Sequence, residues 1–175
     1  MLKPTRVKTT KDAKLAEAFI FKALKPDGFS KSGYTKNYNI PSIKDILAWS
    51  SWANLKRPEQ PSFIIKGKGR IVAGIFGEPV EGHFDVGESE IQHVLFLKEY
   101  ENKNNALALL SKTVEFYKEK RAKQVHFWML ESDFNKNRYS LWQKISQDSF
   151  GFAFKGFRRI SKWSGKPIVK IEKYF

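Results

Sequence analysis

The apolar positions between residues 90 and 120 change their spacing halfway along the stretch. Ile91 and residues 94–97 form a short apolar run rich in strand-forming side chains, which predicts a buried central strand. From Asn104 onward, core-type side chains recur at three- and four-residue intervals, which places them on one face of a helix. They are Ala106, Leu109, Leu110, Thr113, Val114 and Tyr117. The polar turn at 99–105 leaves backbone N–H groups free at the helix start, an arrangement that favours a phosphate group.

Helical and strand spacings also precede this stretch. Apolar residues at helical intervals begin at Ala13, and a turn containing proline and glycine at 26–28 ends that helix. Two apolar runs that flank Gly67 and Gly69 predict an antiparallel hairpin. The expected elements of this half are a strand at 5–8, helices at 13–24 and 42–56, a loop at 29–39 and strands at 62–66 and 70–76.

The C-terminal half predicts a parallel neighbour for the central strand. The apolar run at 124–130 follows the long helix, and a right-handed crossover of this kind pairs its two strands in parallel. A helix at 136–145 and strands at 150–160 and 168–174 complete the chain. This order predicts one α/β (α+β) domain over residues 1–175, with a mixed central sheet of about six to seven strands and flanking helices.

The charge of the chain narrows the partners that we expect. A net charge of +14 and a pI near 9.9 favour an anionic partner, because like charges oppose folding unless they are neutralised. Nucleic acid is the first such partner, and an anionic membrane surface is the second. The absence of cysteine excludes disulfides and thiolate chemistry. The sequence has no apolar run of membrane-spanning length and no apolar leader, so it predicts a cytoplasmic protein. Nucleic acid, and no membrane, is the expected partner.

The strand, turn and helix around residues 98–110 resemble the acyl-CoA-binding motif of the GNAT N-acyltransferase superfamily. In that family a glycine-rich turn wraps the pyrophosphate of coenzyme A. The key glycine falls here on Asn104, a residue type that tolerates a left-handed backbone. The resemblance implies a GNAT fold, acetyl-CoA or another acyl-CoA as the cofactor, and a set of cofactor-binding positions. These are Phe96, Leu97, Asn102, Lys103, Asn104, Asn105, Ala106 and Trp142.

Two further positions depart from the family pattern. Glu101 replaces an Arg or Gln, and its carboxylate would repel a pyrophosphate, so a strand–helix crossover without a ligand stays open as an alternative. Residues 135–145 resemble the second family signature, in which a Tyr reprotonates the coenzyme A thiolate. That Tyr falls on Trp142, which cannot donate the proton. Tyr139 is therefore the expected proton donor.

Short phrases also resemble a divergent branch of the superfamily, the Mom-like DNA-modification proteins of phages. They are the pair Lys103-Asn104, the turn at 75–79, Asp133 after the strand at 124–130, and the pair Trp142-Gln143. This resemblance implies the transfer of an acyl-type group to the 6-amino group of adenine in phage or host DNA. Such a modification protects DNA against restriction.

Acyl transfer to an amine needs a group that accepts the proton of the amine. We expect Asp133 or His93 to do so, because Asp133 lies at a strand end where ligands gather and His93 lies on the central strand. His126 is expected to be structural. The strand histidines have no carboxylate at ligand spacing, so no metal site is expected.

A base of duplex DNA must leave the stack to reach such a pocket, and aromatic side chains would then stack on it. The C-terminal strands carry the strongest concentration of basic residues. The expected nucleic-acid-binding residues are Tyr34, Lys36, Tyr38, Lys155, Arg158, Arg159 and Lys162.

Two other functions fit the same sequence. The first is a conventional acetyl-CoA-dependent N-acetyltransferase that acts on a small-molecule or protein amine. The second is a catalytically inactive GNAT scaffold that only binds nucleic acid, because a fold by itself does not fix a function. The sequence leaves open whether the protein forms a homodimer.

Overall fold

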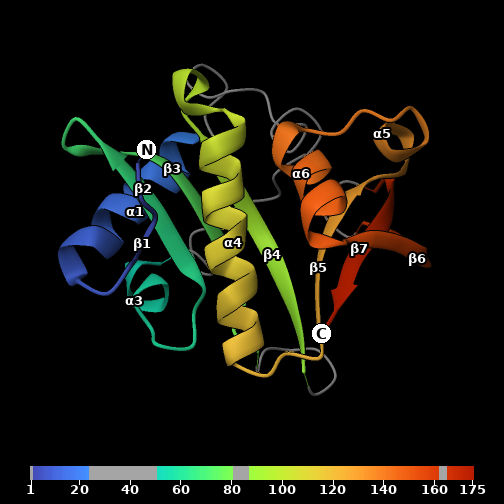
Figure 1. Ribbon diagram of the computed structural model, residues 1–175, viewed down its shortest axis with the longest axis horizontal. Coiled ribbons are helices and arrows are strands. Elements are labelled where there is room, and N and C mark those ends of the chain that lie inside the picture. Colours follow the sequence, from blue (N-terminus) through green and yellow to red (C-terminus); the bar gives the residue numbers. More distant parts are fainter. Residues whose placement is uncertain (1, 24–50, 81–86, 162–164) are drawn as a thin grey trace.

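The computed structural model describes residues 2–23, 51–80, 87–161 and 165–175, which form a mixed sheet with helices on both faces (Figure 1). The sheet has seven strands in the order β1-β2-β3-β4-β5-β7-β6. They are β1 (Thr5–Arg6), β2 (Ser62–Gly67), β3 (Arg70–Gly77), β4 (Glu88–Phe96), β5 (Gln124–Leu130), β6 (Ala153–Ile160) and β7 (Pro167–Tyr174). The helices are α1 (Thr10–Ala23), α3 (Trp52–Leu55), α4 (Lys103–Glu119), α5 (Glu131–Asn135) and α6 (Leu141–Phe150), with a 3-10 turn, η1 (Lys98–Tyr100).

Side chains along β4 alternate between two hydrophobic cores, as expected for a strand that is buried on both faces. Val94 and Phe96 pack in the larger core with Leu109 of α4. Leu95 points the other way and packs in a second core with Phe19 of α1. The β1–β4 half of the sheet is therefore enclosed between α4 on one face and α1 on the other.

The two parallel strands at the centre of the sheet are paired only near their first residues. The pairing of β4 with β5 ends at Glu90, opposite His126. Beyond these residues the strands diverge, as can be followed upward from their lower ends in Figure 1. On their other edges β4 pairs with β3, and β5 pairs with β7. The sheet is therefore divided between β4 and β5.

The helix α6 begins later than the sequence pattern predicted. It was expected at 136–145, but α6 begins at Leu141 because the Gln143 side chain accepts a hydrogen bond from the Ser140 N–H at 2.9 Å. The segment directly after β5, where no helix was predicted, forms the short helix α5. Gly151 ends α6 with φ +71°, a left-handed conformation that suits glycine.

The fold class expected from the sequence is confirmed, because the described residues form a mixed seven-stranded sheet with flanking helices. The hairpin of β2 and β3 and the parallel pairing of β4 with β5 are also as expected. The first strand is shorter than predicted. The loop at 29–39 and residues 42–50 of the second predicted helix lie outside the described residues. In the part of the chain that is described, no helix has both the length and the apolar character needed to cross a membrane.

Candidate active site

The divergence of β4 from β5 exposes a backbone edge of β4 that no other described strand covers. Leu97 donates its N–H to the Val72 carbonyl on the β3 side, at 2.8 Å. Because successive N–H groups of a strand point to opposite edges, those of Val94 and Phe96 point toward β5. These N–H groups are hydrogen-bond donors for a ligand that lies between the two strands.

A β-bulge lies where β4 and β5 begin to diverge. On the β3 side, Phe76 is opposite His93, whereas the next residue, Gly77, is opposite Ile91. Gln92 is therefore an extra residue in β4, and it bends the strand locally. The bulge places the residue that follows β3 beside the last paired residue of β4, since the Glu78 N–H donates to the Glu90 carbonyl at 2.8 Å.

A buried tyrosine of α4 holds this bulge from the helix side. The Tyr117 hydroxyl lies 3.0 Å from the Glu78 carbonyl oxygen and 3.2 Å from that of Glu90, so its single proton is shared between them. Burial and the nearby carboxylates raise the pKa of Tyr117 well above its ordinary value, so the hydroxyl remains a donor. Its oxygen occupies the space that a side chain at Gly77 would need.

Glu78 is the carboxyl group whose protonation the fold changes most among the described acids. It is 6% exposed, and its Oε1 accepts a hydrogen bond from Gln92 Nε2 at 2.8 Å. Its Oε2 has no hydrogen-bond partner among the described residues. Burial, and then the charge of Glu90, raise the pKa of Glu78 to about 7, against the opposing effect of the Gln92 hydrogen bond. Such a group exchanges protons near neutral pH.

Glu90 connects this carboxyl group to the other half of the sheet. Trp128 Nε1 on β5 donates to Glu90 Oε2 at 3.3 Å, and His126 Nε2 lies 3.7 Å from the same oxygen. His126 and Trp128 also contact each other edge to face, with ring centroids 5.6 Å apart. In the described ranges no group of three or more His, Asp or Glu side chains is arranged to hold a metal ion.

The three residues expected to carry the chemistry lie on three different elements. His93 lies on β4, where burial lowers its pKa to about 4, so it is neutral at physiological pH. Asp133 lies in α5, and its backbone carbonyl accepts a hydrogen bond from the Arg138 N–H at 2.8 Å. Tyr139 lies just before α6 and packs edge to face on Phe134. Glu78 and Glu90 lie where the strands part, and of the three expected residues only His93 is close to them, since the charge of Glu90 acts on its pKa.

The expected cofactor-binding residues surround the start of α4. Asn102 caps the helix by accepting a hydrogen bond from the Asn105 N–H at 3.0 Å, and the Asn105 side chain donates to the Tyr100 carbonyl at 2.9 Å. Asn105 is therefore buried, whereas Lys103 and Asn104 are exposed. Phe96, Ala106 and Trp142 belong to the larger core, with Leu97 packed against it.

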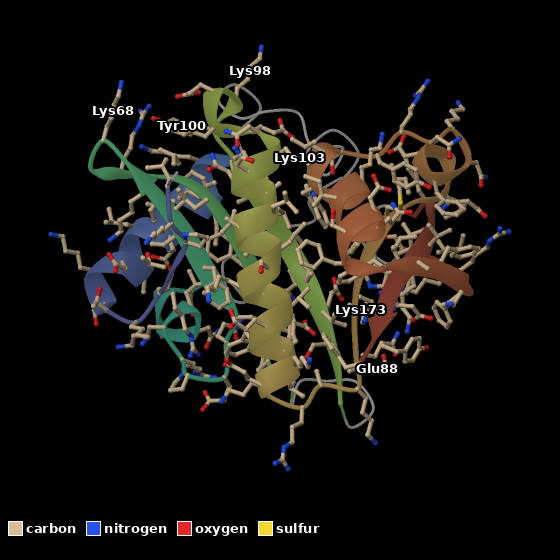
Figure 2. The ribbon with its side chains drawn as sticks, in the orientation of Figure 1. Lys68, Glu88, Lys98, Tyr100, Lys103 and Lys173 are labelled. Atoms are coloured by element: carbon tan, nitrogen blue, oxygen red, sulfur yellow. The ribbon has the colours of Figure 1, made fainter. Side chains whose placement is uncertain are left out.

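A hollow beside these residues runs between α4 and α6. Its volume is about 310 Å³, and its walls come from both helices. Figure 2 shows Lys98 and Lys103 at the end of the molecule where α4 begins. The lining residues are Asn104, Leu107, Ala108, Ser111 and Phe150.

The basic residues expected to bind nucleic acid are divided by the pairing of β6 with β7. Arg158 is opposite Val169, whose side chain belongs to the larger core, and Arg158 Nε lies 3.1 Å from Glu131 Oε1. Arg159 is opposite Ile168, and its Cζ lies 3.8 Å above the Trp128 ring on the opposite face. Lys155 is exposed. Tyr34, Lys36, Tyr38 and Lys162 lie outside the described residues.

Glu78 and Glu90 are the site residues that sequence reasoning missed. Glu78 sits between Gly77 and Pro79, within the turn at 75–79 that was noted for its resemblance to the Mom-like branch, but no role was expected for its carboxylate. The sequence did contain one indication of a site here. A single carboxylate directly after the almost wholly apolar strand β3 lies either in the core or at its edge, where a buried acid is unusual. Its proximity to Glu90 follows from strand pairing, which local sequence does not specify.

The fold and this site define a class of protein: a mixed α/β domain whose two central parallel strands diverge beside the start of a long helix. No protein-family model matches the sequence, and no curated protein matches it. Solved structures match it over almost the whole chain. The ribosomal-protein-alanine N-acetyltransferase from Brucella melitensis has a TM-score of 0.67 at 15% identity, covering 99% of this chain and 100% of that one.

Other matching structures belong to the same group of enzymes. An acetyltransferase of the GNAT family from Streptococcus pneumoniae has a TM-score of 0.65 at 13% identity, covering 100% of this chain and 99% of that one. The Salmonella typhimurium protein yncA, solved with its cofactor acetyl-CoA, has a TM-score of 0.62 at 13% identity. The match covers 99% of this chain and 94% of that one. The chain therefore has the fold of the GNAT acetyltransferases.

Proposed function

We propose that this protein is an acyl-CoA-dependent N-acyltransferase. The observation that carries the proposal is the divergence of β4 from β5, with the carboxyl groups of Glu78 and Glu90 where the strands part and the start of α4 toward its open end. A thioester, an amine and a proton acceptor have to meet in such a reaction. The GNAT fold of the chain, shared with a structure that holds acetyl-CoA, supports this choice of donor.

The residues at the open end fit an acyl-CoA. Lys98 and Lys103 are exposed cations beside the N-terminus of α4, where backbone N–H groups favour phosphate. The hollow between α4 and α6 offers apolar walls from Leu107 and Phe150. The N–H groups of Val94 and Phe96 offer donors to amide and carbonyl oxygens. Glu101 is half-buried just before α4, and its negative charge opposes the binding of phosphate there.

The residues of this chain would divide the reaction as follows. Bound acyl-CoA supplies a thioester, whose acyl carbon gains a bond to the amine nitrogen and loses its bond to sulfur. Glu78 in its ionised form accepts the proton that the nitrogen releases. The β4 N–H groups stabilise negative charge on the carbonyl oxygen. Tyr139 is the proposed donor of a proton to the departing sulfur. Asp133 and His93 are the alternative proton acceptors.

We further propose that the acceptor amine is carried by nucleic acid, with the 6-amino group of adenine in DNA as the specific case. The net charge of +14 supports a polyanionic acceptor. The basic strand β6, which carries Lys155 and Arg159, supports it as well. A small-molecule or protein amine is the competing acceptor, and a scaffold that binds nucleic acid without catalysis is the competing function.

Neutralising Lys103 is expected to weaken acetyl-CoA binding by about three- to tenfold, because a charge-assisted contact to phosphate contributes about 1 kcal/mol at an exposed helix start. Isothermal titration calorimetry of Lys103→Gln measures this loss. The matched control is Lys112→Gln, on the same helix but hydrogen-bonded to Glu115 and about 13 Å further along. An equal loss in both variants, or no acetyl-CoA binding by the folded wild type, would contradict the proposal.

Cells that express the protein are expected to contain an acylated nucleoside that cells expressing Glu78→Gln lack. Mass spectrometry of nucleosides from digested DNA and RNA measures the adduct, and its mass identifies the transferred group. If the nucleosides are unchanged but the protein binds acetyl-CoA, the acceptor is a small-molecule or protein amine and not nucleic acid. Unchanged nucleosides without acetyl-CoA binding would leave only the inactive scaffold.

A further inference from the structure

The face of β5, β7 and β6 that is turned away from α6 carries a line of aromatic and cationic side chains. Arg159 of β6 lies over the Trp128 ring at 3.8 Å, and the Phe157 ring contacts the same Trp128 edge to face at 5.7 Å. Lys170 Nζ lies 5.3 Å from the centre of the Phe157 ring, but its charge is offset by Glu172 at 3.0 Å and Glu88 at 3.6 Å. We call Trp128, Phe157 and Arg159 the aromatic strip.

The aromatic strip is continuous with the candidate active site. Trp128, its buried end, donates a hydrogen bond from Nε1 to Glu90 Oε2. Glu90 in turn raises the pKa of Glu78. A molecule that lies on the strip therefore extends toward the carboxyl groups from the face opposite the hollow between α4 and α6.

The outer end of the strip is open because β6 bulges there. Its pairing with β7 is interrupted between Phe154 and Arg158, and Gly156 allows this with φ +97°. Phe157 follows directly and is 51% exposed, which is unusual for a ring of this size. Figure 1 shows β6 at the outer edge of the sheet.

Charge selects the occupant of this surface. An exposed aromatic ring with an arginine side chain two residues along the same strand is suited to a stacked base with its phosphates. A second copy of the chain would bring another net charge of +14, and an edge strand with several cations resists pairing with its own kind. A duplex hides the faces of its bases, whereas a single strand offers them.

We propose that the aromatic strip binds single-stranded nucleic acid, with an unpaired base stacked on Phe157 and its phosphates near Arg159. This inference rests on the proposed function, because the bound strand would present an amine to Glu78. It names the acceptor class as an unpaired base of a single strand. The proposal also assigns nucleic-acid binding to residues on only one face of the sheet, the face turned away from α6.

The test compares Phe157→Ala, Arg159→Ala and Arg158→Ala by fluorescence anisotropy with a short labelled DNA single strand and with its duplex, at physiological salt. Phe157→Ala and Arg159→Ala are each expected to weaken single-strand binding by about tenfold, the size of one stacking contact. Arg158→Ala removes the same charge from the neighbouring residue on the opposite face, and its affinity is expected to change by less than about twofold. Circular dichroism confirms that each variant is folded.

Several results would overturn the proposal. Equal losses in Arg158→Ala and Arg159→Ala would mean that charge alone is responsible, without the strip. Tighter binding of the duplex, or equal binding of a polyglutamate peptide, would assign the surface to another polyanion. A wild-type dimer that Phe157→Ala dissociates would assign it to a second copy.

Acetyl-CoA titrations of the same samples separate the two proposals. If the protein binds a single strand through the aromatic strip but does not bind acetyl-CoA, the proposed function is contradicted and the role of the strip is supported. If the protein binds acetyl-CoA but no single strand, the proposed function is supported and the role of the strip is contradicted.

Discussion

Replacement of Glu78 by Gln is expected to lower kcat for acyl transfer by about 10²- to 10⁴-fold, the range for loss of a general base. The amide keeps the size of the side chain and the hydrogen bond with Gln92, but it cannot accept the proton of the amine. KM for acyl-CoA is expected to stay within about threefold, because Glu78 lies outside the hollow between α4 and α6. Steady-state kinetics of both proteins measures the two constants.

The pH dependence of the wild type provides an independent readout of Glu78. The pKa of Glu78 is raised to about 7, and only the ionised carboxylate accepts a proton. The rate is therefore expected to rise about tenfold per pH unit below pH 7 and to level off above it. In Glu78→Gln this inflection should be absent.

Asp133→Asn and His93→Gln are the variants that discriminate between the proton acceptors. If Glu78 is the base, both keep the inflection of the pH profile near 7. A rate loss of 10²-fold or more in either of them, with Glu78→Gln close to wild type, would assign the base to that residue instead. Because the pKa of His93 is lowered to about 4, a histidine base would leave the rate flat across neutral pH.

The substitution Gly77→Ala is expected to lower the free energy of unfolding by about 3 kcal/mol, at the upper end for overpacking a buried site. A Cβ at this position would collide with the Tyr117 hydroxyl and lie 2.7 Å from the Glu90 carbonyl oxygen. Neither can move without loss of the hydrogen bonds that hold the β3–β4 bulge. Urea denaturation measures the change.

Gly67→Ala is the matched control for this substitution. Gly67 lies in the same hairpin, but its nearest neighbours are the side chains of Tyr100 and Val72, each 3.3 Å from an added Cβ. Side chains adjust more cheaply than backbone, so the expected change is less than about 1 kcal/mol. Similar losses in both variants would show that the Tyr117 contact does not fix the bulge.

Gly77→Ala also tests whether the bulge positions the active site. Glu78 is the next residue, and its carbonyl is one of the two groups that Tyr117 holds. We expect kcat to fall in Gly77→Ala under conditions where the variant is still folded, while acetyl-CoA affinity is unchanged. Gly67→Ala should keep the wild-type kcat.

The elements that sequence analysis placed correctly are those with a strong local signal. The strand β4, the helix α4 and the strand β5 follow from apolar spacing over short windows, and their parallel pairing follows from the crossover between them. The start of α6 was misplaced, because the hydrogen bond between Ser140 and Gln143 competes with a helical pattern that begins earlier.

The candidate site was predicted only in part. The start of α4 near residue 104 was predicted from the apolar spacing, whereas the cofactor-binding role expected for the residues around it stays a prediction. The carboxyl pair was missed, because Glu78 and Glu90 are brought together by the pairing of β3 with β4. The catalytic roles expected for Asp133, His93 and Tyr139 stay predictions.

By itself the sequence determined the class of fold, the strand–turn–helix at residues 90–120 and the large positive charge, since each depends on local pattern or composition. Only the tertiary structure decided three other properties. Burial raised the pKa of Glu78, strand pairing brought Trp128 to Glu90 across 38 residues, and the register of β6 separated Arg158 from Arg159. Desolvation and sheet register arise from contacts between residues distant in sequence, which a local pattern does not encode.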